Sequence, residues 1–104
     1  MNDMKQVAIT TVEQLKEAVR GSKLKLVRVS ASWCGPCRSI QPLVEQFEEE
    51  NDDNMIYLDA DLSPELISHF GIRGVPTILK LDDELNVLMT NVGMISKQKL
   101  EEFK

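Results

Sequence analysis

Long hydrophobic runs are missing from this 104-residue chain. A membrane-spanning helix needs about 18 or more consecutive apolar residues, and charged residues break each apolar run here, as at Leu24–Arg28. Residues 1–7 also lack the apolar stretch and the small-residue cleavage site of a secretory signal. We therefore expect a soluble protein without a membrane partner, located in the cytoplasm.

An excess of basic residues is missing as well. The chain has 12 lysines and arginines against 17 aspartates and glutamates, which gives a formal net charge of −5 at pH 7. Binding to a nucleic-acid backbone needs clustered positive charge, so we expect no nucleic-acid partner. The length suits one domain, and no repeat or linker divides it. Residues 1–104 are expected to form a single, monomeric domain.

Cysteine is scarce, because Cys34 and Cys37 are the only two in the chain. A pair this close in sequence cannot staple a secreted disulfide scaffold, so it indicates redox chemistry or metal binding. Structural zinc takes four ligands, and even with the distant His69 this chain offers only three candidates. The redox interpretation is favoured over zinc, and also over two packed core thiols. His69 is expected to be an ordinary surface or packed side chain.

The hydrophobic pattern predicts strands that alternate with helices. Thr10-Thr11-Val12-Glu13 resembles a capping box at the start of a first helix, and Ser63-Pro64 and Ser96 are typical of later helix starts. The expected helices are about 11–20, one from the cysteines through Phe47, one from Ser63 to Phe70 and one after Ser96; the expected strands are 24–31, 55–60, 77–81 and 85–92, the last two joined by a hairpin at 82–84. We expect an α/β fold in the order β-α-β-α-β-α-β-β-α, with helices on both faces of a mixed sheet.

The position of the two cysteines at a helix start predicts their chemistry. Unpaired backbone N–H groups and the helix dipole favour a negative charge on the first sulfur, so Cys34 is expected to be the attacking thiolate. Cys37 lies close enough to attack a mixed disulfide formed on Cys34. Gly35 leaves room for a partner chain, and Pro36 suits an early helical position that needs no N–H donor.

The segment Trp33-Cys34-Gly35-Pro36-Cys37-Arg38 resembles the active-site signature of the thioredoxin family. Gly71-Ile72-Arg73-Gly74-Val75-Pro76-Thr77 is similar to the family segment that carries a cis-proline, and Val92-Gly93 to a second groove loop. The element order also matches, so the resemblance covers essentially the whole chain. It implies a thioredoxin-like fold and a cis Val75-Pro76 bond.

The resemblance also implies a function, the reduction of protein disulfides with Cys34 as nucleophile and Cys37 as resolving cysteine. The implied partners are disulfide-containing proteins and an NADPH-dependent flavoprotein, thioredoxin reductase, as electron donor, and the chain itself is expected to hold no cofactor. The implied substrate surface consists of Trp33, Gly35, Pro36, Gly74, Val75, Pro76, Gly93 and Met94. A specialised oxidase or isomerase and a non-enzymatic peptide-binding module are the alternatives, although the Gly-Pro dipeptide resembles the reducing branch.

Two residues depart from the family pattern. The family commonly places a buried aspartate where this chain has Arg28, and a lysine where it has Tyr57. A charge within a central strand must be paired, reach solvent or face an anion. We expect Arg28 either to reach solvent or pair with a carboxylate such as Asp59, or to stabilise the reduced thiolates. Asp59 and Asp61 are considered as substitutes for the missing aspartate.

Overall fold

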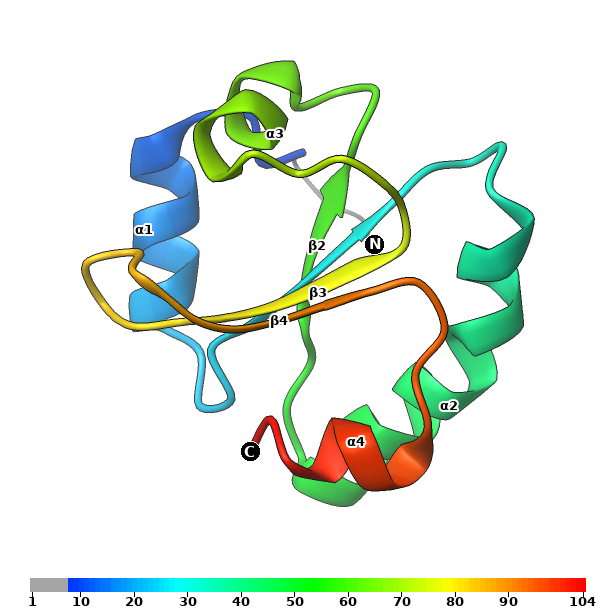
Figure 1. Ribbon diagram of the computed structural model, residues 1–104. Coiled ribbons are helices and arrows are strands. Elements are labelled where there is room, and N and C mark those ends of the chain that lie inside the picture. Colours follow the sequence, from blue (N-terminus) through cyan, green and yellow to red (C-terminus); the bar gives the residue numbers. More distant parts are fainter. Residues whose placement is uncertain (1–7) are drawn as a thin grey trace, which may run out of the picture.

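The computed structural model describes residues 8–104, which form four helices and four strands (Figure 1). Their order is α1 (Val12–Arg20), β1 (Leu26–Ser30), α2 (Gly35–Asn51), β2 (Ile56–Asp59), α3 (Pro64–Phe70), β3 (Thr77–Leu81), β4 (Val87–Val92) and α4 (Lys97–Glu101). The expected order begins with one further strand before α1. Residues 8–10 are not in a strand, and the residues before them lie outside the described part of the chain.

The four strands form one mixed sheet in the order β2-β1-β3-β4. β1 pairs with β2 in parallel, whereas β3 runs antiparallel to both β1 and β4. With its 7 residues, α3 is too short to carry the chain back along the sheet, so it stays at the end where β2 finishes (Figure 1). β3 therefore starts at that same end, where Thr77 pairs with Val29 of β1.

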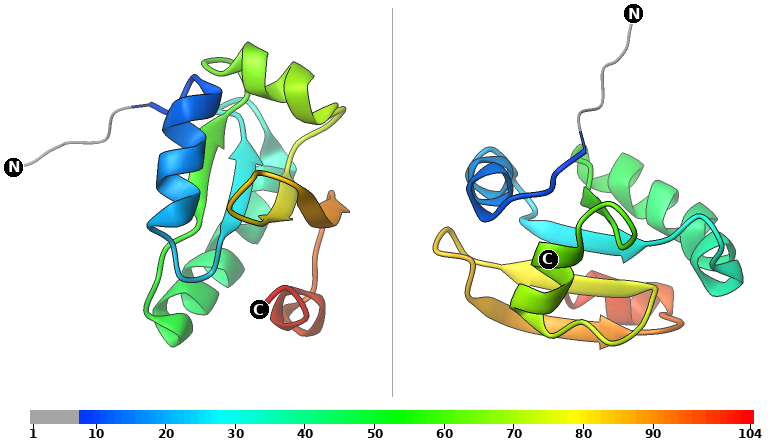
Figure 2. Two further views of the ribbon diagram at one scale, coloured as in Figure 1. Left: turned by 90° about the vertical axis from the view of Figure 1, so that its left-hand side faces the viewer. Right: turned by 90° about the horizontal axis from the view of Figure 1, so that it is seen from above.

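Helices cover both faces of the sheet, as the sequence predicts (Figure 2). On one face, Leu15 and Val19 of α1 and Leu66 of α3 pack against the inward side chains of β1 and β3. On the other face, α2 and α4 pack against Leu26 and Ile78. Because side chains alternate along a strand, Arg28 lies on the α2 face of β1.

Two helix starts show how far the capping prediction holds. At α1 the capping box forms, since the Thr11 hydroxyl accepts the Gln14 N–H and the Gln14 side chain accepts the Thr11 N–H. Ser63 occupies the N-cap position of α3 with Pro64 in the first turn, but its side chain makes no capping hydrogen bond. Its hydroxyl donates instead to the carbonyl of Ile9. Ser63 therefore ties the segment before α1 to α3.

The hairpin between β3 and β4 is longer than the predicted 82–84. Leu85 lies in the turn with a φ of 66° rather than in the strand, and its N–H donates to the carbonyl of Asp82. The Asp82 carboxylate accepts hydrogen bonds from the N–H groups of Glu84 and Asn86. The carboxylate thus organises the whole turn, and β4 begins only at Val87.

Asp53, which directly follows the C-cap of α2, binds the loop between α1 and β1. Its Oδ2 accepts hydrogen bonds from the Ser22 hydroxyl at 3.2 Å and from the N–H groups of Lys23 and Leu24 at 2.9 Å each. Burial raises the pKa of this carboxyl, but the hydrogen bonds outweigh burial and hold the pKa below its usual value. The folded state therefore favours the charged carboxylate.

Asp53→Asn is expected to lower the free energy of unfolding by about 1 kcal/mol at neutral pH. Hydrogen bonds to a charged group contribute more than this when buried, and solvent screening weakens them here. A lowered folded-state pKa stabilises the fold fully above the unfolded value of about 3.9, and this contribution is lost as the pH falls further. Urea unfolding of the variant and the parent at several pH values tests this. Asp52→Asn, which removes none of these hydrogen bonds, is the control. If both variants lost the same free energy of unfolding at neutral pH, the role assigned to the Asp53 carboxylate would be wrong.

Within residues 8–104, no helix is both long and apolar enough to cross a membrane.

Candidate redox site

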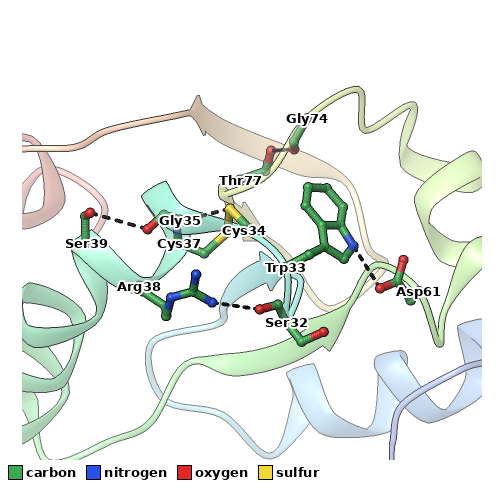
Figure 3. The surroundings of a disulfide bond; sticks show 10 residues. All are labelled: Ser32, Trp33, Cys34, Gly35, Cys37, Arg38, Ser39, Asp61, Gly74 and Thr77. Carbon is green, nitrogen blue, oxygen red and sulfur yellow. Dashed lines mark hydrogen bonds between the residues drawn. A yellow bond between two sulfur atoms is a disulfide. The ribbon is translucent and has the colours of Figure 1, made fainter.

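Cys34 and Cys37 are joined by a disulfide at the start of α2 (Figure 3). Cys34 is the N-cap residue of this helix, Pro36 lies in the first turn and Cys37 follows it, with a Cα–Cα distance of 5.3 Å between the two cysteines. The loop after β1 delivers them there, because β1 ends at Ser30 and the N–H of Cys34 donates to the carbonyl of Ala31. The predicted placement at a helix start is confirmed.

The surroundings of the two sulfur atoms are unequal. The Cys37 N–H donates to Cys34 Sγ at 3.1 Å, so the first sulfur occupies the position of an N-cap oxygen. Both cysteines are 3% exposed and pack against Ala31, with Ala60 and Val75 at the edge of the cluster. A negative charge on Cys34 would therefore meet a backbone donor and the positive end of the helix dipole.

Two side chains fix the loop that carries the cysteines (Figure 3). The Trp33 Nε1–H donates to Asp61 Oδ2 at 3.0 Å, although the Trp33 side chain is 66% exposed. The Arg38 guanidinium donates to the carbonyl of Ser32 at 2.8 Å. Trp33 is therefore an ordered apolar surface beside the disulfide.

The Gly74–Pro76 segment lies opposite the disulfide, and its Val75-Pro76 bond is cis, as predicted. The Gly74 carbonyl accepts the Thr77 hydroxyl at 2.6 Å, and the Pro76 carbonyl accepts the Gly93 N–H at 2.8 Å. Gly93 has a φ of 88°, a conformation that side chains rarely adopt. The two predicted groove loops therefore touch.

A shallow, mostly apolar depression of about 170 Å³ lies beside Trp33. Of the predicted groove residues, it includes Trp33, Gly74 and Val75. Gly35, Pro36, Pro76, Gly93 and Met94 are not part of its lining, and Met94 is 63% exposed on the second groove loop. Among residues 8–104, no atom lies within 4 Å of a Cβ built at Gly35, so these residues leave the space above this glycine open.

Sequence reasoning missed four residues that line this depression: Ala60, Ile67, Ile72 and Arg73. Ile72 and Arg73 fall inside the Gly71–Thr77 segment, so the motif itself could have suggested them. Ala60 and Ile67 carried no signal, because they reach the depression only through the packing of β2 and α3 against the cysteine loop.

A second, more polar depression of about 550 Å³ opens between α2 and the β2 edge of the sheet. Arg28, Ser30, Tyr57 and Cys37 are among the residues that line it. The Arg28 guanidinium lies over the Tyr57 ring, 5.0 Å from its centroid, because the parallel register places these two residues side by side. Arg28 and Cys37 therefore line one cavity.

The predicted pairing of Arg28 with Asp59 does not form. Within residues 8–104, no carboxylate lies within ion-pair distance of Arg28. Asp59 Oδ1 instead accepts the N–H groups of Asp61 and Leu62, because the chain turns sharply after β2. Neither Asp59 nor Asp61 lines the depression beside Cys37. The Asp59 carboxylate therefore binds the loop after β2, and the Asp61 carboxylate binds Trp33.

His69 lies away from the cysteines, exposed on α3, with its ring edge-on to Phe70 at 4.8 Å between centroids. In the part of the chain that the structure describes, no three histidine, cysteine or acidic side chains are grouped to hold a metal ion.

Known proteins share both the sequence and the fold. The thioredoxin family model matches residues 6–103. A thioredoxin of Listeria monocytogenes is 36% identical over 102 residues, which cover 95% of this chain and 93% of the relative. A thioredoxin of Alicyclobacillus acidocaldarius is 39% identical over 93 residues, 88% of each chain. The X-ray structure of Fasciola hepatica thioredoxin superposes with a TM-score of 0.76 at 27% identity, covering 93% of this chain and 94% of the other.

Proposed function

Since the chain belongs to the thioredoxin family of protein-disulfide reductases, we propose distinct roles for the two cysteines of its redox pair. Cys34 attacks the substrate disulfide and Cys37 resolves the adduct. The observation that carries this assignment is the hydrogen bond from the Cys37 N–H to Cys34 Sγ at the N-terminus of α2. It stabilises a thiolate at Cys34, and the thiolate is the nucleophile in disulfide exchange.

The reaction proceeds in two exchanges. The Cys34 thiolate donates an electron pair to one sulfur of the substrate, and the other substrate sulfur leaves as a thiolate. Cys37 then loses its proton and attacks Cys34, which releases the second substrate thiolate and forms the Cys34–Cys37 disulfide. The substrate gains two electrons and the protein loses two.

The substrate segment is proposed to lie extended across Trp33, Val75 and the Gly93 loop. Within residues 8–104, no hydrogen bond uses the N–H or the carbonyl of Val75, so both groups are free to pair with another backbone. Gly74 packs close to Val92, where an added Cβ would lie 3.7 Å from a Val92 methyl group. Pro76 and the 63% exposed Met94 flank this path, and Gly35 leaves it open.

The electron donor is proposed to be an NADPH-dependent flavoprotein, thioredoxin reductase, because a disulfide must be reduced again after each turnover. The chain is proposed to work as a monomer of one domain in the reducing cytoplasm and to need no bound cofactor, since both exchanges use only its own sulfur atoms.

A coupled assay tests this assignment of donor and direction. With catalytic amounts of the protein, a bacterial thioredoxin reductase and insulin, NADPH oxidation should continue until one of the substrates is exhausted. The reductase with insulin alone is the control. If the coupled assay consumes no NADPH but the protein still reduces insulin when dithiothreitol is the reductant, thioredoxin reductase is not the donor. The disulfide-reductase function would then still hold.

A further inference from the structure

The polar depression between α2 and β2 is lined by the resolving cysteine and by a cation of the sheet. Cys37 and Arg28 line the same cavity, which lies between α2 and the edge strand β2. Arg28 is half-buried on the α2 face of β1, and the Tyr57 ring supports its guanidinium. A cation held over an aromatic face keeps its charge and has a restricted position.

The charged side chains that line this cavity are Arg28, Arg38 and Glu48. Arg38 directly follows Cys37 in α2, and its guanidinium is bound to the Ser32 carbonyl. Glu48 is the one carboxylate of the lining, and it lies 11 residues further along α2 than Cys37 (48 − 37), which is about 16 Å along the helix axis. Glu48 also accepts the N–H of Met55. It therefore cannot take the Cys37 proton directly.

The other charged groups near the disulfide lie on its opposite side. Asp61 is bound to Trp33, Asp59 to the loop after β2, and Arg73 lines the apolar depression. Two titratable side chains line the Cys37 cavity from the sheet, Arg28 and the Tyr57 that supports it. Arg28 is the cation of the two, and it has no carboxylate partner in residues 8–104.

We propose that Arg28 is a positioning residue for the second exchange: its guanidinium, held over Tyr57, stabilises the Cys37 thiolate, and the open cavity passes the Cys37 proton directly to water. Cys37 then attacks Cys34, the substrate sulfur leaves as a thiolate, and no carboxylate acts as a base. The inference rests on the proposed roles of the two cysteines and concerns the second exchange alone.

Arg28→Met removes the charge and keeps most of the volume of the side chain. One unit charge in a solvated cavity changes the thiolate population by roughly threefold to tenfold at neutral pH. A more basic thiolate is also a better nucleophile, which offsets part of this loss and leaves resolution about threefold slower near pH 7. At a pH where Cys37 is fully ionised in both proteins, they no longer differ in the thiolate fraction at Cys37. The variant should then resolve the adduct as fast as the parent or faster. The two pH profiles should cross.

The experiment is stopped-flow reaction of the reduced protein with an asymmetric peptide disulfide, from about pH 6 to about pH 10. Release of a chromogenic thiol reports the attack by Cys34, and release of a fluorescent peptide thiol reports resolution by Cys37. Arg28→Lys should restore the profile of the parent. Arg20→Met, the same change at an exposed residue of α1 on the other face of the sheet, is the matched control.

The outcomes distinguish failure of the proposed function from failure of the inference. If the chromogenic thiol is released without an adduct on Cys34, the proposed function fails. If the adduct forms normally but Arg28→Met resolves it with the pH profile of the parent, only the role of Arg28 is wrong. Slower resolution by a constant factor at every pH would indicate a purely structural role and would also overturn the inference. Arg28→Gln gives the same comparison if the methionine variant does not fold.

Discussion

Replacing Cys34 with serine is expected to abolish the reduction of insulin by dithiothreitol, lowering the catalysed rate by on the order of a thousandfold or more. A hydroxyl is a far weaker nucleophile than the thiolate that the N-terminus of α2 stabilises. Serine is also a favourable N-cap residue, so its oxygen can accept the Cys37 N–H in place of the sulfur. The loss is therefore expected to be chemical and not structural.

Insulin turbidity measures this effect, and urea unfolding of the variant and of the parent, both in excess reductant, separates it from stability. Ser39→Ala is a suitable control, because Ser39 is exposed on the same helix and its hydroxyl donates to the carbonyl of Gly35 in that helix. A folded Cys34→Ser variant that retains a tenth or more of the activity would show that Cys34 is not the nucleophile.

Cys37→Ser is expected to trap the substrate, whereas Cys34→Ser should trap little of it. The Cys37→Ser variant keeps the attacking thiol and lacks the resolving thiol. A stable mixed disulfide between Cys34 and the substrate should accumulate to near one equivalent. Its lifetime without added thiol should exceed that of the parent adduct by on the order of a hundredfold, since an outside thiol lacks the proximity of Cys37.

Mass spectrometry of the trapped adduct identifies the cysteine that holds the substrate. The matched variant is Cys34→Ser, which keeps Cys37 as the only thiol of the chain. Both cysteines are 3% exposed, but within residues 8–104 it is Cys34 Sγ, and not Cys37 Sγ, that accepts a backbone N–H, so this variant should trap little substrate. Preferential trapping by Cys37 would reverse the assigned roles.

The redox pair could be predicted from the sequence because its geometry is local. Two residues separate the cysteines, and Pro36 in the first turn together with the apolar stripe ending at Phe47 defines the helix that orients them. The cis bond before Pro76 was predictable only through the resemblance of its segment to the family, since nothing in the local composition requires it.

The environment of Arg28 could not be predicted in the same way, because it depends on contacts between distant segments. The support from Tyr57 follows from the register of β1 with β2, and the sequence of either strand leaves that register open. The pairing with Asp59 was a reasonable expectation from charge alone, but the turn after β2 uses that carboxylate for its own N–H groups. Likewise, Ser63 has the expected position but donates to Ile9, a partner far away in the sequence.

Every role assigned to the Cys34–Cys37 pair depends on its acting as a reductant, and its reduction potential tests that claim most directly. The protein would be equilibrated with buffers of reduced and oxidised glutathione or dithiothreitol, and the fraction of disulfide measured after acid quenching and thiol alkylation. The standard reduction potential of a thioredoxin is about −270 mV, and this chain belongs to that family. We expect a potential near that value, displaced toward the oxidising side if Arg28 stabilises the reduced form. A potential near the −120 mV or so of a periplasmic oxidase would contradict the account, because such a pair would oxidise protein thiols instead of reducing disulfides.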